Sequence, residues 1–325
     1  MNTLDDSSRL TDAIGTVDVV IAAYNAAGTI GEAIKSALAQ PETATVIVID
    51  DASRDDTVAI ARASDDATGR LRILRQDRNG GPSCARNRGI AAGSAPWITV
   101  LDADDALLSG RFAALLRYAN KADLIADDLL VREEGMFETR PMFLPPVDRP
   151  QSFDAVAFVN GNISHGQKGR RDLGFIKPLV RRELLFRHAI GFDESLWLGE
   201  DYELYTRALL LGGRLLLVPA AGYVYTVRPT SLSGEHTLEA LRMLRDCDLR
   251  LVTIPGLTTA QKEALDKHYQ SVDRRLQWRL LIAAVKRRDA KAAAATFGRS
   301  GPISLFLAGM LLKEAGRRAR LARPA

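Results

Sequence analysis

Continuous apolar runs alternate with helical apolar faces along the first 130 residues. Uninterrupted runs are typical of strands that are buried on both faces, whereas apolar positions spaced three and four apart predict amphipathic helices. The expected strands lie at 17–25, 44–53, 71–76, 97–105 and 123–131. The expected helices between them lie at 29–40, 54–64 and 80–93.

This strand–helix order predicts an α/β domain with a mainly parallel central sheet and helices on both of its faces. In such sheets, ligands bind outside the carboxyl ends of the strands. Four polar clusters fall at those ends and should therefore meet at one edge. They are Tyr24-Asn25, Asp50-Asp51, Asn79-Gly80 and Asp102-Ala103-Asp104.

The second half of the chain has a different pattern. Residues 132–175 contain four prolines and no clear periodicity, so we expect an irregular connector. Regular patterns return at 178–192, 196–213 and 214–219, and from Thr237 onward the chain has a helical pattern. We therefore predict a flexible tail over 1–16, an α/β domain over 17–235 and a basic C-terminal helical extension over 236–325.

Composition is that of an ordinary soluble protein, with 46% hydrophobic and 26% charged residues. The net charge of +4 is unevenly spread, because residues 262–325 hold 15 Lys/Arg against 5 Asp/Glu. Cys84 and Cys247 are far apart, as expected of free thiols in a reducing cytoplasm. We see no signal peptide and no apolar run of the ~20 residues that a membrane span needs.

Three carboxylates crowd the end of the apolar run Trp97–Leu101: Asp102, Asp104 and Asp105. So much negative charge at a strand end requires a positive partner. An Asp-x-Asp pair can offer oxygen ligands to Mg²⁺ or Mn²⁺, and such ions also bind substrate phosphates. The alternative is a solvated turn in which aspartates cap a helix, and Asp105 is the best candidate for that cap.

Several motifs occur together in an order that is highly specific. The first strand ends in Tyr24-Asn25, the second ends in Asp50-Asp51-Ala-Ser, an Asn-x-Gly…Ala-Arg-Asn-x-Gly segment spans 79–89, and Leu-Asp-x-Asp-Asp follows at 101–105. Gly199-Glu200-Asp201 then precedes an apolar helix. Over residues 17–235 the chain resembles the family 2 glycosyltransferases, which have the GT-A fold. Bacterial exopolysaccharide glucosyltransferases of the succinoglycan type are the nearest in appearance.

The resemblance implies a nucleotide-sugar site. Tyr24 would stack on the nucleobase and Asp51 would bind the base or ribose, although a core tyrosine and a helix-capping aspartate are the alternatives. Asp104 would bind the divalent cation directly, with Asp102 as a ribose or water-mediated partner. Backbone N–H groups at Gly80 could face the donor. The remaining implied donor-site residues are Ala22, Asn25, Arg86 (alternatively a surface salt bridge) and Arg228, which would contact phosphate.

Sugar transfer also needs a base that takes the proton of the acceptor hydroxyl group. The resemblance makes Asp201 that base and Glu200 its support, although acidic residues are common at helix N-termini for other reasons. Trp197 would form an apolar platform for the acceptor sugar or would simply pack in the core. The implied mechanism is a single in-line displacement that inverts the anomeric centre.

The expected partners follow from the same resemblance. The donor would be UDP-glucose, and the acceptor a saccharide, either free or carried on a polyprenyl diphosphate. Processive relatives often carry Gln-x-x-Arg-Trp and transmembrane helices, and this chain shows neither, so single-sugar transfer is favoured. The basic segment 302–323 could bind an anionic membrane from the cytoplasmic side, or pack on the core with a solvated basic end.

Three rival functions remain open. A nicotinamide dehydrogenase should show Gly-x-Gly-x-x-Gly after its first strand, and residues 22–32 lack that motif. A nucleic-acid-binding protein could use the basic tail, but the acidic strand ends would then have no role, so we expect no nucleic-acid partner. A sugar-nucleotide hydrolase would show the same donor site and differ only in transferring the sugar to water.

Overall fold

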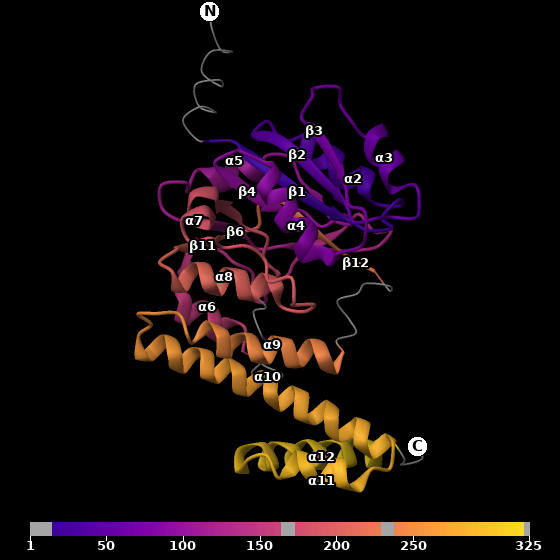
Figure 1. Cartoon of the computed structure of the whole chain (residues 1–325), viewed down its shortest axis with the longest axis vertical. Helices are drawn as coiled ribbons and strands as arrows, with labels where there is room; N and C mark the ends of the chain where they lie inside the picture. The colour runs from indigo at the N-terminus through magenta and orange to yellow at the C-terminus, as the bar shows by residue number, and fades with distance from the viewer. Residues whose placement is uncertain (1–14, 164–172, 229–236, 322–325) are drawn as a thin grey trace, which may run out of the picture. The chain divides into compact units, whose positions relative to one another are not determined.

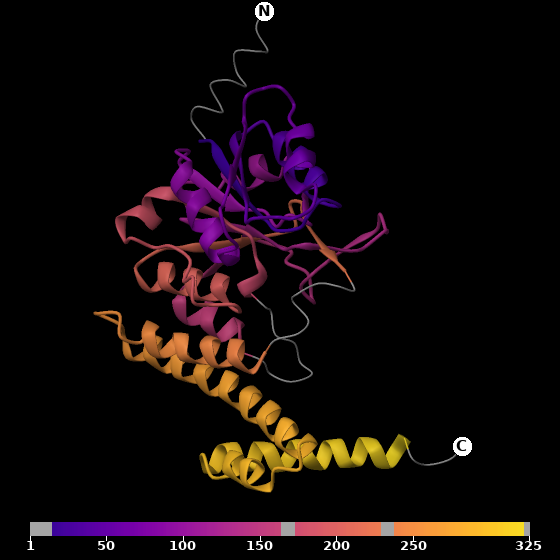
Figure 2. The same cartoon turned by 45° about the vertical axis from the view of Figure 1, so that its right-hand side comes forward.

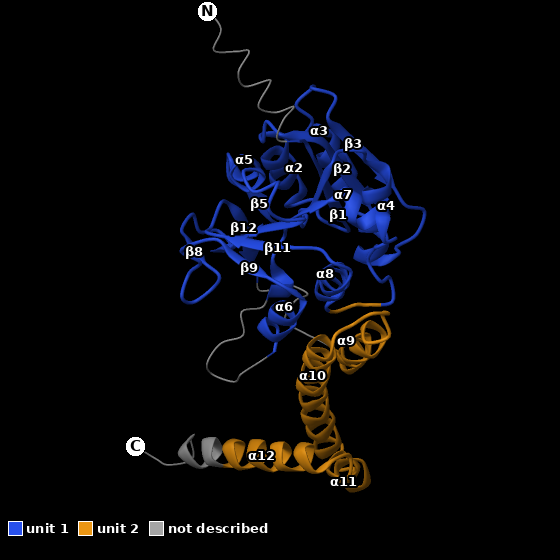
Figure 3. Ribbon diagram, turned by 90° about the vertical axis from the view of Figure 1, so that its left-hand side faces the viewer, with its two compact units in different colours: residues 1–195, 199–232 blue, residues 196–198, 233–325 orange. Residues whose placement is uncertain are grey.

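The computed structural model describes residues 15–163, 173–228 and 237–321 (Figure 1). The chain forms two compact units (Figure 3). The first comprises residues 1–195 and 199–232, and the second comprises residues 196–198 and 233–325. Most of the expected tail, residues 1–14, and the expected domain boundary near 235 lie outside the described residues.

An eight-stranded sheet forms the centre of the first unit. All strands except β10 and β9 run in one direction, which confirms the mainly parallel sheet expected from the sequence. In spatial order the strands are β3 (Leu71–Arg75), β2 (Thr43–Asp50), β1 (Val17–Ala23), β4 (Trp97–Val100), β10 (Leu179–Arg181), β6 (Leu124–Asp127), β11 (Leu215–Val218) and β9 (Gln151–Phe153).

Helices cover both faces of this sheet because alternate strand residues point to opposite sides. Val19 and Ile21 of β1 belong to the main core with helix α2 (Ile30–Leu38). Ile47 and Ile49 of β2 pack instead with Ala85 of α4 (Gly81–Ala92). Gly89 allows α4 to lie close to β1, because a Cβ atom there would come within 2.3 Å of the Val20 side chain.

A second sheet of four strands flanks the first. Its order is β5 (Ala106–Leu107), β12 (Tyr223–Val227), β7 (Leu130–Glu133) and β8 (Thr139–Pro141). The single strand expected over 123–131 is therefore wrong, because β6 and β7 belong to different sheets. Asp127, the last residue of β6, and Asp128, which follows it, accept backbone hydrogen bonds from outside the strand, which redirects the chain.

The described helices of the first unit lie between these strands in the chain. The region expected to be irregular, 132–175, contains β8, β9 and a helix, so its order was underestimated. The helices besides α2 and α4 are α3 (Thr57–Ala63), α5 (Arg111–Leu116), α6 (Ala155–Gly161), the 3-10 turn η2 (Leu173–Phe175), α7 (Arg182–Arg187) and α8 (Glu200–Leu210).

The second unit confirms the expected helical extension. Its helices are α9 (Leu238–Leu251), α10 (Thr259–Lys286), α11 (Ala290–Phe297) and α12 (Gly301–Leu321). Figure 2 shows α12 crossing the end of α10, where Leu281 packs against Ile303 and Leu307. Among the described residues, no helix has both the length and the apolar character needed to cross a membrane.

Candidate active site

The loops after β1 and β2 are tied together where the site was expected. Asn25 has a φ of 50°, its N–H donates to Ser53 Oγ at 2.9 Å, and its side-chain oxygen accepts from the Arg54 N–H at 2.9 Å. The neighbouring Tyr24 ring is 48% exposed and therefore accessible for stacking. Ala22 lies inside β1 and packs on the α4 side of the sheet. Nucleotide binding by these residues stays a prediction.

Asp51 is buried and holds the start of α4. Its Oδ1 accepts from the Gly80 N–H at 2.8 Å, and its Oδ2 accepts from the Gly81 N–H at 2.9 Å. The expectation that the Gly80 N–H faces the donor therefore does not agree with the structure, because an intramolecular carboxylate already accepts it. Asp51 shapes this edge of the site, as the capping alternative proposed.

Arg86 connects two acidic segments that are far apart in sequence. Its side chain is only 7% exposed. Nη2 donates to Asp102 Oδ1 at 2.9 Å, and Nη1 donates to Glu200 Oε1 at 2.9 Å. The alternative of a surface salt bridge is therefore wrong: Arg86 is a buried cation between the end of β4 and the start of α8.

Lys177 lies in the candidate site, although none of the sequence motifs contains it. Its side chain is 6% exposed, and its ammonium group lies 2.8 Å from Asp201 Oδ2 and 3.1 Å from Asp102 Oδ2. Together Arg86, Asp102, Lys177, Glu200 and Asp201 form what we call the charge cluster. The available signal was a single charge inside the apolar stretch 175–180. Buried charges need partners, so this lysine pointed to a buried acid.

The two aspartates of the charge cluster have opposite pKa shifts. Burial by itself raises the pKa of Asp102, but Lys177 and Arg86 outweigh that effect and hold it below the usual range. Burial dominates at Asp201 and raises its pKa, although Lys177 and Arg86 act against it. A carboxylate with a raised pKa is a stronger base than a free aspartate.

Asp201 owes its place to a tight turn at the start of α8. Gly199 has a φ of 78°, a conformation that favours glycine, and it directs Glu200 and Asp201 into the first helical turn. Asp201 Oδ2 accepts a hydrogen bond from Lys177. The other oxygen, Oδ1, is buried and has no hydrogen-bond partner among the described residues.

Asp104 is the most accessible of the three clustered aspartates, with 40% of its side chain exposed. Its nearest cation is Arg228, whose Nη1 lies 3.8 Å from Asp104 Oδ2 and whose Nε lies 3.3 Å from Glu134 Oε1. Burial and the negative charge of Asp102 raise the pKa of Asp104. This accessible carboxylate has a single basic neighbour at 3.8 Å and can therefore offer an oxygen ligand to a divalent cation.

Asp102 fits a cation less well, since each of its oxygens already faces a basic side chain. No group of three Asp, Glu, His or Cys side chains converges as a metal site in the described part of the chain. Magnesium and manganese commonly take few protein ligands and complete their coordination with waters and substrate phosphates. Asp104 as the direct ligand agrees with that chemistry.

Asp105 does not cap a helix, contrary to the alternative raised from the sequence. It is buried and accepts from the Tyr223 hydroxyl at 2.9 Å and from the Thr226 N–H at 2.8 Å. The Tyr223 hydroxyl in turn accepts from the Asp102 N–H at 3.2 Å. Asp105 thus anchors the acidic loop to β12.

The fully buried ion pair between Arg111 and Asp127 lies next to the charge cluster and holds the backbone of Lys177. Arg111 donates from Nε and Nη2 to Asp127 Oδ1, at 3.0 and 2.8 Å. Its Nη2 also donates to the Lys177 carbonyl oxygen at 2.5 Å. The other Asp127 oxygen accepts from the Gly222 N–H at 2.9 Å. This pair fixes the backbone of Lys177 and the start of β12 together.

Trp197, expected at the acceptor site, has a ring that is 68% exposed. It belongs to the short segment grouped with the C-terminal unit. Full burial in the core, the alternative reading of this residue, is therefore wrong. Its contact with an acceptor sugar stays a prediction.

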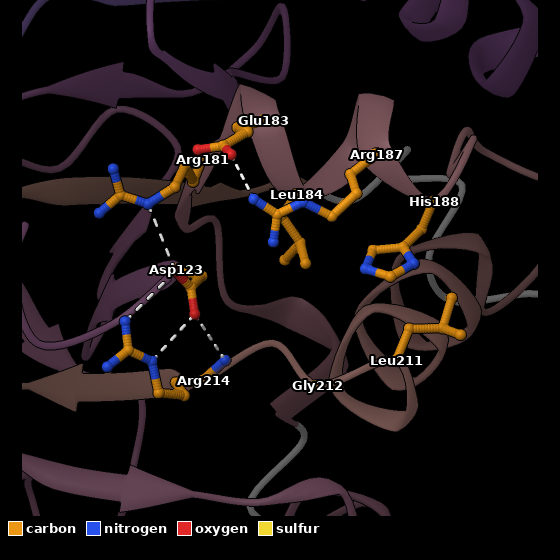
Figure 4. A pocket seen from close by; sticks show the side chains of 9 residues that line it. All are labelled: Asp123, Arg181, Glu183, Leu184, Arg187, His188, Leu211, Gly212 and Arg214. Atoms are coloured by element: carbon orange, nitrogen blue, oxygen red, sulfur yellow. Dashed lines mark hydrogen bonds and ion pairs between the residues drawn. The ribbon is translucent and has the colours of Figure 1, made fainter. Parts of the chain in front are cut away.

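A second charged region lies at the opposite, amino-terminal edge of β6 and β11. It surrounds a cavity of about 220 Å³ (Figure 4). Asp123 is held there by Arg181 at 3.3 Å and by Arg214 at 3.1 Å. Arg187 pairs with Glu183 nearby. The strand ends that bear the sequence motifs are at the other edge, so this cavity is separate from the candidate active site.

The fold and the charge cluster define a class of protein. A parallel sheet with an Asp-x-Asp loop after β4, and an aspartate at the start of α8 beside it, is the arrangement of a GT-A glycosyltransferase. The model of glycosyl transferase family 2 matches residues 18–173. The chain belongs to glycosyltransferase family 2 and is an enzyme of that class.

Two curated relatives come from Rhizobium meliloti. Succinoglycan biosynthesis protein ExoU is 42% identical over 81% of this chain and 77% of its own length. Succinoglycan biosynthesis protein ExoO is 35% identical over 88% of this chain and 82% of its own length. Both identities, over most of each chain, support the family assignment.

Two solved structures share the fold. Staphylococcus aureus TarS 1–349 in complex with UDP-GlcNAc has a TM-score of 0.61 at 18% identity, covering 86% of this chain and 90% of that one. The mannosyltransferase PcManGT from Pyrobaculum calidifontis, in complex with GDP-Man and Mn²⁺, has a TM-score of 0.60 at 19% identity, covering 95% and 81%. At these identities the likeness concerns the fold alone.

Proposed function

We propose that the protein transfers one sugar, glucose, from its UDP-linked form to a saccharide acceptor in the synthesis of an exopolysaccharide. The names of the two Rhizobium meliloti relatives support the exopolysaccharide. The UDP-sugar complex of TarS supports a nucleotide-linked donor, since the two chains share a fold. We propose a polyprenyl-diphosphate-linked saccharide as the acceptor.

One observation carries this proposal: the arrangement of the Asp201 carboxylate. Lys177 holds one of its oxygens at 2.8 Å, while the other is buried and accepts no hydrogen bond among the described residues. A buried acceptor atom without a partner is costly and needs an explanation. A substrate hydroxyl group that donates to Oδ1 supplies it.

The chemistry follows from that oxygen. Asp201 Oδ1 takes the proton of the acceptor hydroxyl, and the acceptor oxygen attacks the anomeric carbon of the sugar. The bond from this carbon to the diphosphate oxygen breaks, and the nucleoside diphosphate departs on the opposite face. One displacement inverts the anomeric centre, so an α-linked donor gives a β-linked product. Isolation of an α-linked product would refute this mechanism.

Asp104 would hold the divalent cation, Mg²⁺ or Mn²⁺, with Asp102 as a neighbour that acts through water. When bound, such an ion offsets the negative charge of the diphosphate. Arg228 lies beside Asp104 and can donate to phosphate oxygens. The Tyr24 ring is exposed and can stack on the base.

We further propose that α12 binds the anionic cytoplasmic face of the membrane, where a lipid-linked acceptor would be found. Leu305 and Leu312 are 77% and 74% exposed, and their spacing of two turns places them on one face. Ile303 and Leu307, on another face, are buried against α10. Lys313 follows the exposed leucines, and the sequence continues with three arginines between 317 and 320.

Calorimetric titration tests the donor site. UDP-glucose, UDP-galactose, UDP-GlcNAc and GDP-mannose would each be titrated with and without Mn²⁺ into the wild type, Asp104→Ala and the surface control Asp66→Ala. We expect metal-dependent binding of UDP-glucose that is lost only in Asp104→Ala. Preference for another donor would refute glucose, and equal binding by Asp104→Ala would refute the metal assignment.

Transfer itself is distinguished from hydrolysis by the products. Incubation of the preferred donor with a bacterial lipid extract should yield a glycolipid in addition to free UDP. Free sugar at the same rate with and without the extract would favour the hydrolase.

Sedimentation with lipid vesicles tests the membrane proposal. The full chain should bind vesicles rich in phosphatidylglycerol and not phosphatidylcholine vesicles. Leu305→Ser/Leu312→Ser should lose this binding, whereas Leu249→Ser, an exposed leucine on α9, should retain it. Equal binding by all variants would exclude α12 as the membrane-binding helix.

A further inference from the structure

The charge cluster contains a cation whose position a stability role alone does not explain. Lys177 is almost fully buried between Asp102, at the end of β4, and Asp201, at the start of α8. Removing charges from water is expensive, and a hydrophobic residue of similar volume often serves stability equally well. A lysine held between two aspartates therefore suggests a role in the chemistry of the site.

We infer that Lys177 is a positioning residue for sugar transfer: its ammonium group joins Asp102 on the donor side to Asp201 on the acceptor side, and leaves Asp201 Oδ1 without a hydrogen bond, as the oxygen that accepts from the substrate hydroxyl. This inference rests on the proposed function, in which Asp201 is the base. It adds a residue that none of the sequence motifs contains.

The backbone of Lys177 is itself rigidly held. Its carbonyl oxygen accepts from Arg111, and Arg111 and Asp127 form an ion pair in which both side chains are completely buried. Lys177 also lies two residues before Leu179, where β10 begins between β4 and β6. The ammonium group therefore extends from a fixed point in the core.

The other cation of the cluster cannot replace it. Arg86 donates to Asp102 and to Glu200, and its Nη1 lies 3.9 Å from Asp201 Oδ1, beyond hydrogen-bond distance. Lys177 is thus the basic side chain within hydrogen-bond distance of Asp201 in the described part of the chain. Without it, the Asp201 side chain would be free to rotate, and misplacement by ~1 Å can cost ~100-fold in rate.

Steady-state kinetics with the donor identified by calorimetry test the inference. Lys177→Met should lower kcat about 100-fold, because the base is misplaced, while the donor KM stays within about threefold. Lys177→Arg keeps the charge and should recover about tenfold over Lys177→Met. Lys35→Met, an exposed lysine on α2, is the matched control and should behave as the wild type.

The partner of Lys177 is tested by combining variants. In an Asp201→Asn background, adding Lys177→Met should cause little further loss, because residues that act as a unit are not additive. A full 100-fold further loss would overturn the inference, as would a Lys177→Met enzyme within about threefold of wild type or a Lys177→Arg enzyme no better than Lys177→Met.

A measurement without catalysis separates this inference from the proposed function. If the wild type neither transfers nor hydrolyses any donor, the proposed function fails. Thermal unfolding of Lys177→Met, Asp201→Asn and the double variant then decides the pairing. We expect the melting temperature of the double variant to fall by less than the sum of the decreases in the two single variants. Additive decreases would show that Lys177 and Asp201 are not coupled. Lys177→Gln replaces Lys177→Met if the latter does not fold.

Discussion

Two aspartates of the first unit each lie between two basic side chains, yet their carboxyl groups differ in pKa. Asp201 faces Lys177 and Arg86, whose side chains are 6% and 7% exposed. Asp123 faces Arg181 and Arg214, whose side chains are 29% and 59% exposed (Figure 4). Burial raises the pKa of Asp201, whereas at Asp123 the hydrogen bonds and charge of Arg214 outweigh burial and lower the pKa.

The difference teaches that burial, together with the neighbouring negative charges of Glu200 and Asp102, separates the candidate base Asp201 from the structural ion pairs of Asp123. The partly exposed Arg181 and Arg214 side chains stabilise the ionised form of Asp123. At Asp201 desolvation, aided by the negative charges of Glu200 and Asp102, outweighs the two cations, so the carboxylate binds a proton more readily. Side chains with strongly shifted pKa values are concentrated at functional sites.

Replacement of each aspartate by asparagine should give the largest difference between the two regions, measured as the rate of transfer. Asp201→Asn keeps the shape of the side chain but cannot take a proton, so we expect transfer to fall about a thousandfold, within the range for loss of a general base. Asp123→Asn should leave kcat within about threefold. Initial-rate assays with the preferred donor measure both.

Comparable losses in the two variants would contradict the comparison. Circular dichroism and a UDP titration with Mn²⁺ provide the control, since Asp201→Asn should stay folded and bind the nucleotide.

The supporting ion pairs should differ in stability. Arg111→Met leaves Asp127 buried without its cation, so we expect the free energy of unfolding to fall by about 3–5 kcal/mol. Arg214→Met removes a partly exposed pair and should cost about 0–1 kcal/mol. Urea unfolding followed by fluorescence gives both values. A loss in Arg111→Met as small as that in Arg214→Met would show that burial does not govern these pairs.

The pH dependence should differ between the regions too. Asp201 acts as a base only when ionised, and its pKa is raised, so activity should fall with decreasing pH while still above the usual aspartate range. Asp123 has a lowered pKa, so it stabilises the fold at pH values above the unfolded pKa, and that contribution is lost only as pH falls through the lower folded value.

The rate of transfer and the melting temperature, followed over the same pH series, check this order. We expect the rate to decline while the Asp123 contribution to the melting temperature, measured against Asp123→Asn, is still intact. Loss of that contribution before the rate declines would reverse the assignment of the two aspartates.

Much of the fold could be predicted from local pattern. Uninterrupted apolar runs such as 17–25 and 97–101 predict strands that are buried on both faces, because few other structures are compatible with such a run. The single strand over 123–131 was wrong because Asp127 and Asp128 bond to Gly222 and Met142, which are distant in sequence. Their polarity in an apolar run was visible, but their partners were not.

The residues of the candidate site likewise fall into those that the sequence could indicate and those that it could not. Asp104 and Asp201 could be proposed because short motifs carry them. Lys177 and Arg111 could not, since each stands alone in an apolar stretch and its role depends on what it meets. The predicted role of the Gly80 N–H failed for the same reason: nothing local shows that Asp51 accepts it.

By itself, the sequence determined the order of the elements up to about residue 105, the family and the acidic strand ends, because these depend on residues close together in the chain. Only the tertiary structure decided which basic side chains pair with the carboxylates of the site. Arg86 meets Glu200 across 114 positions, and Lys177 meets Asp201 across 24. The strength of such pairs depends on how far folding removes them from water, and burial of this kind is a property of the whole domain.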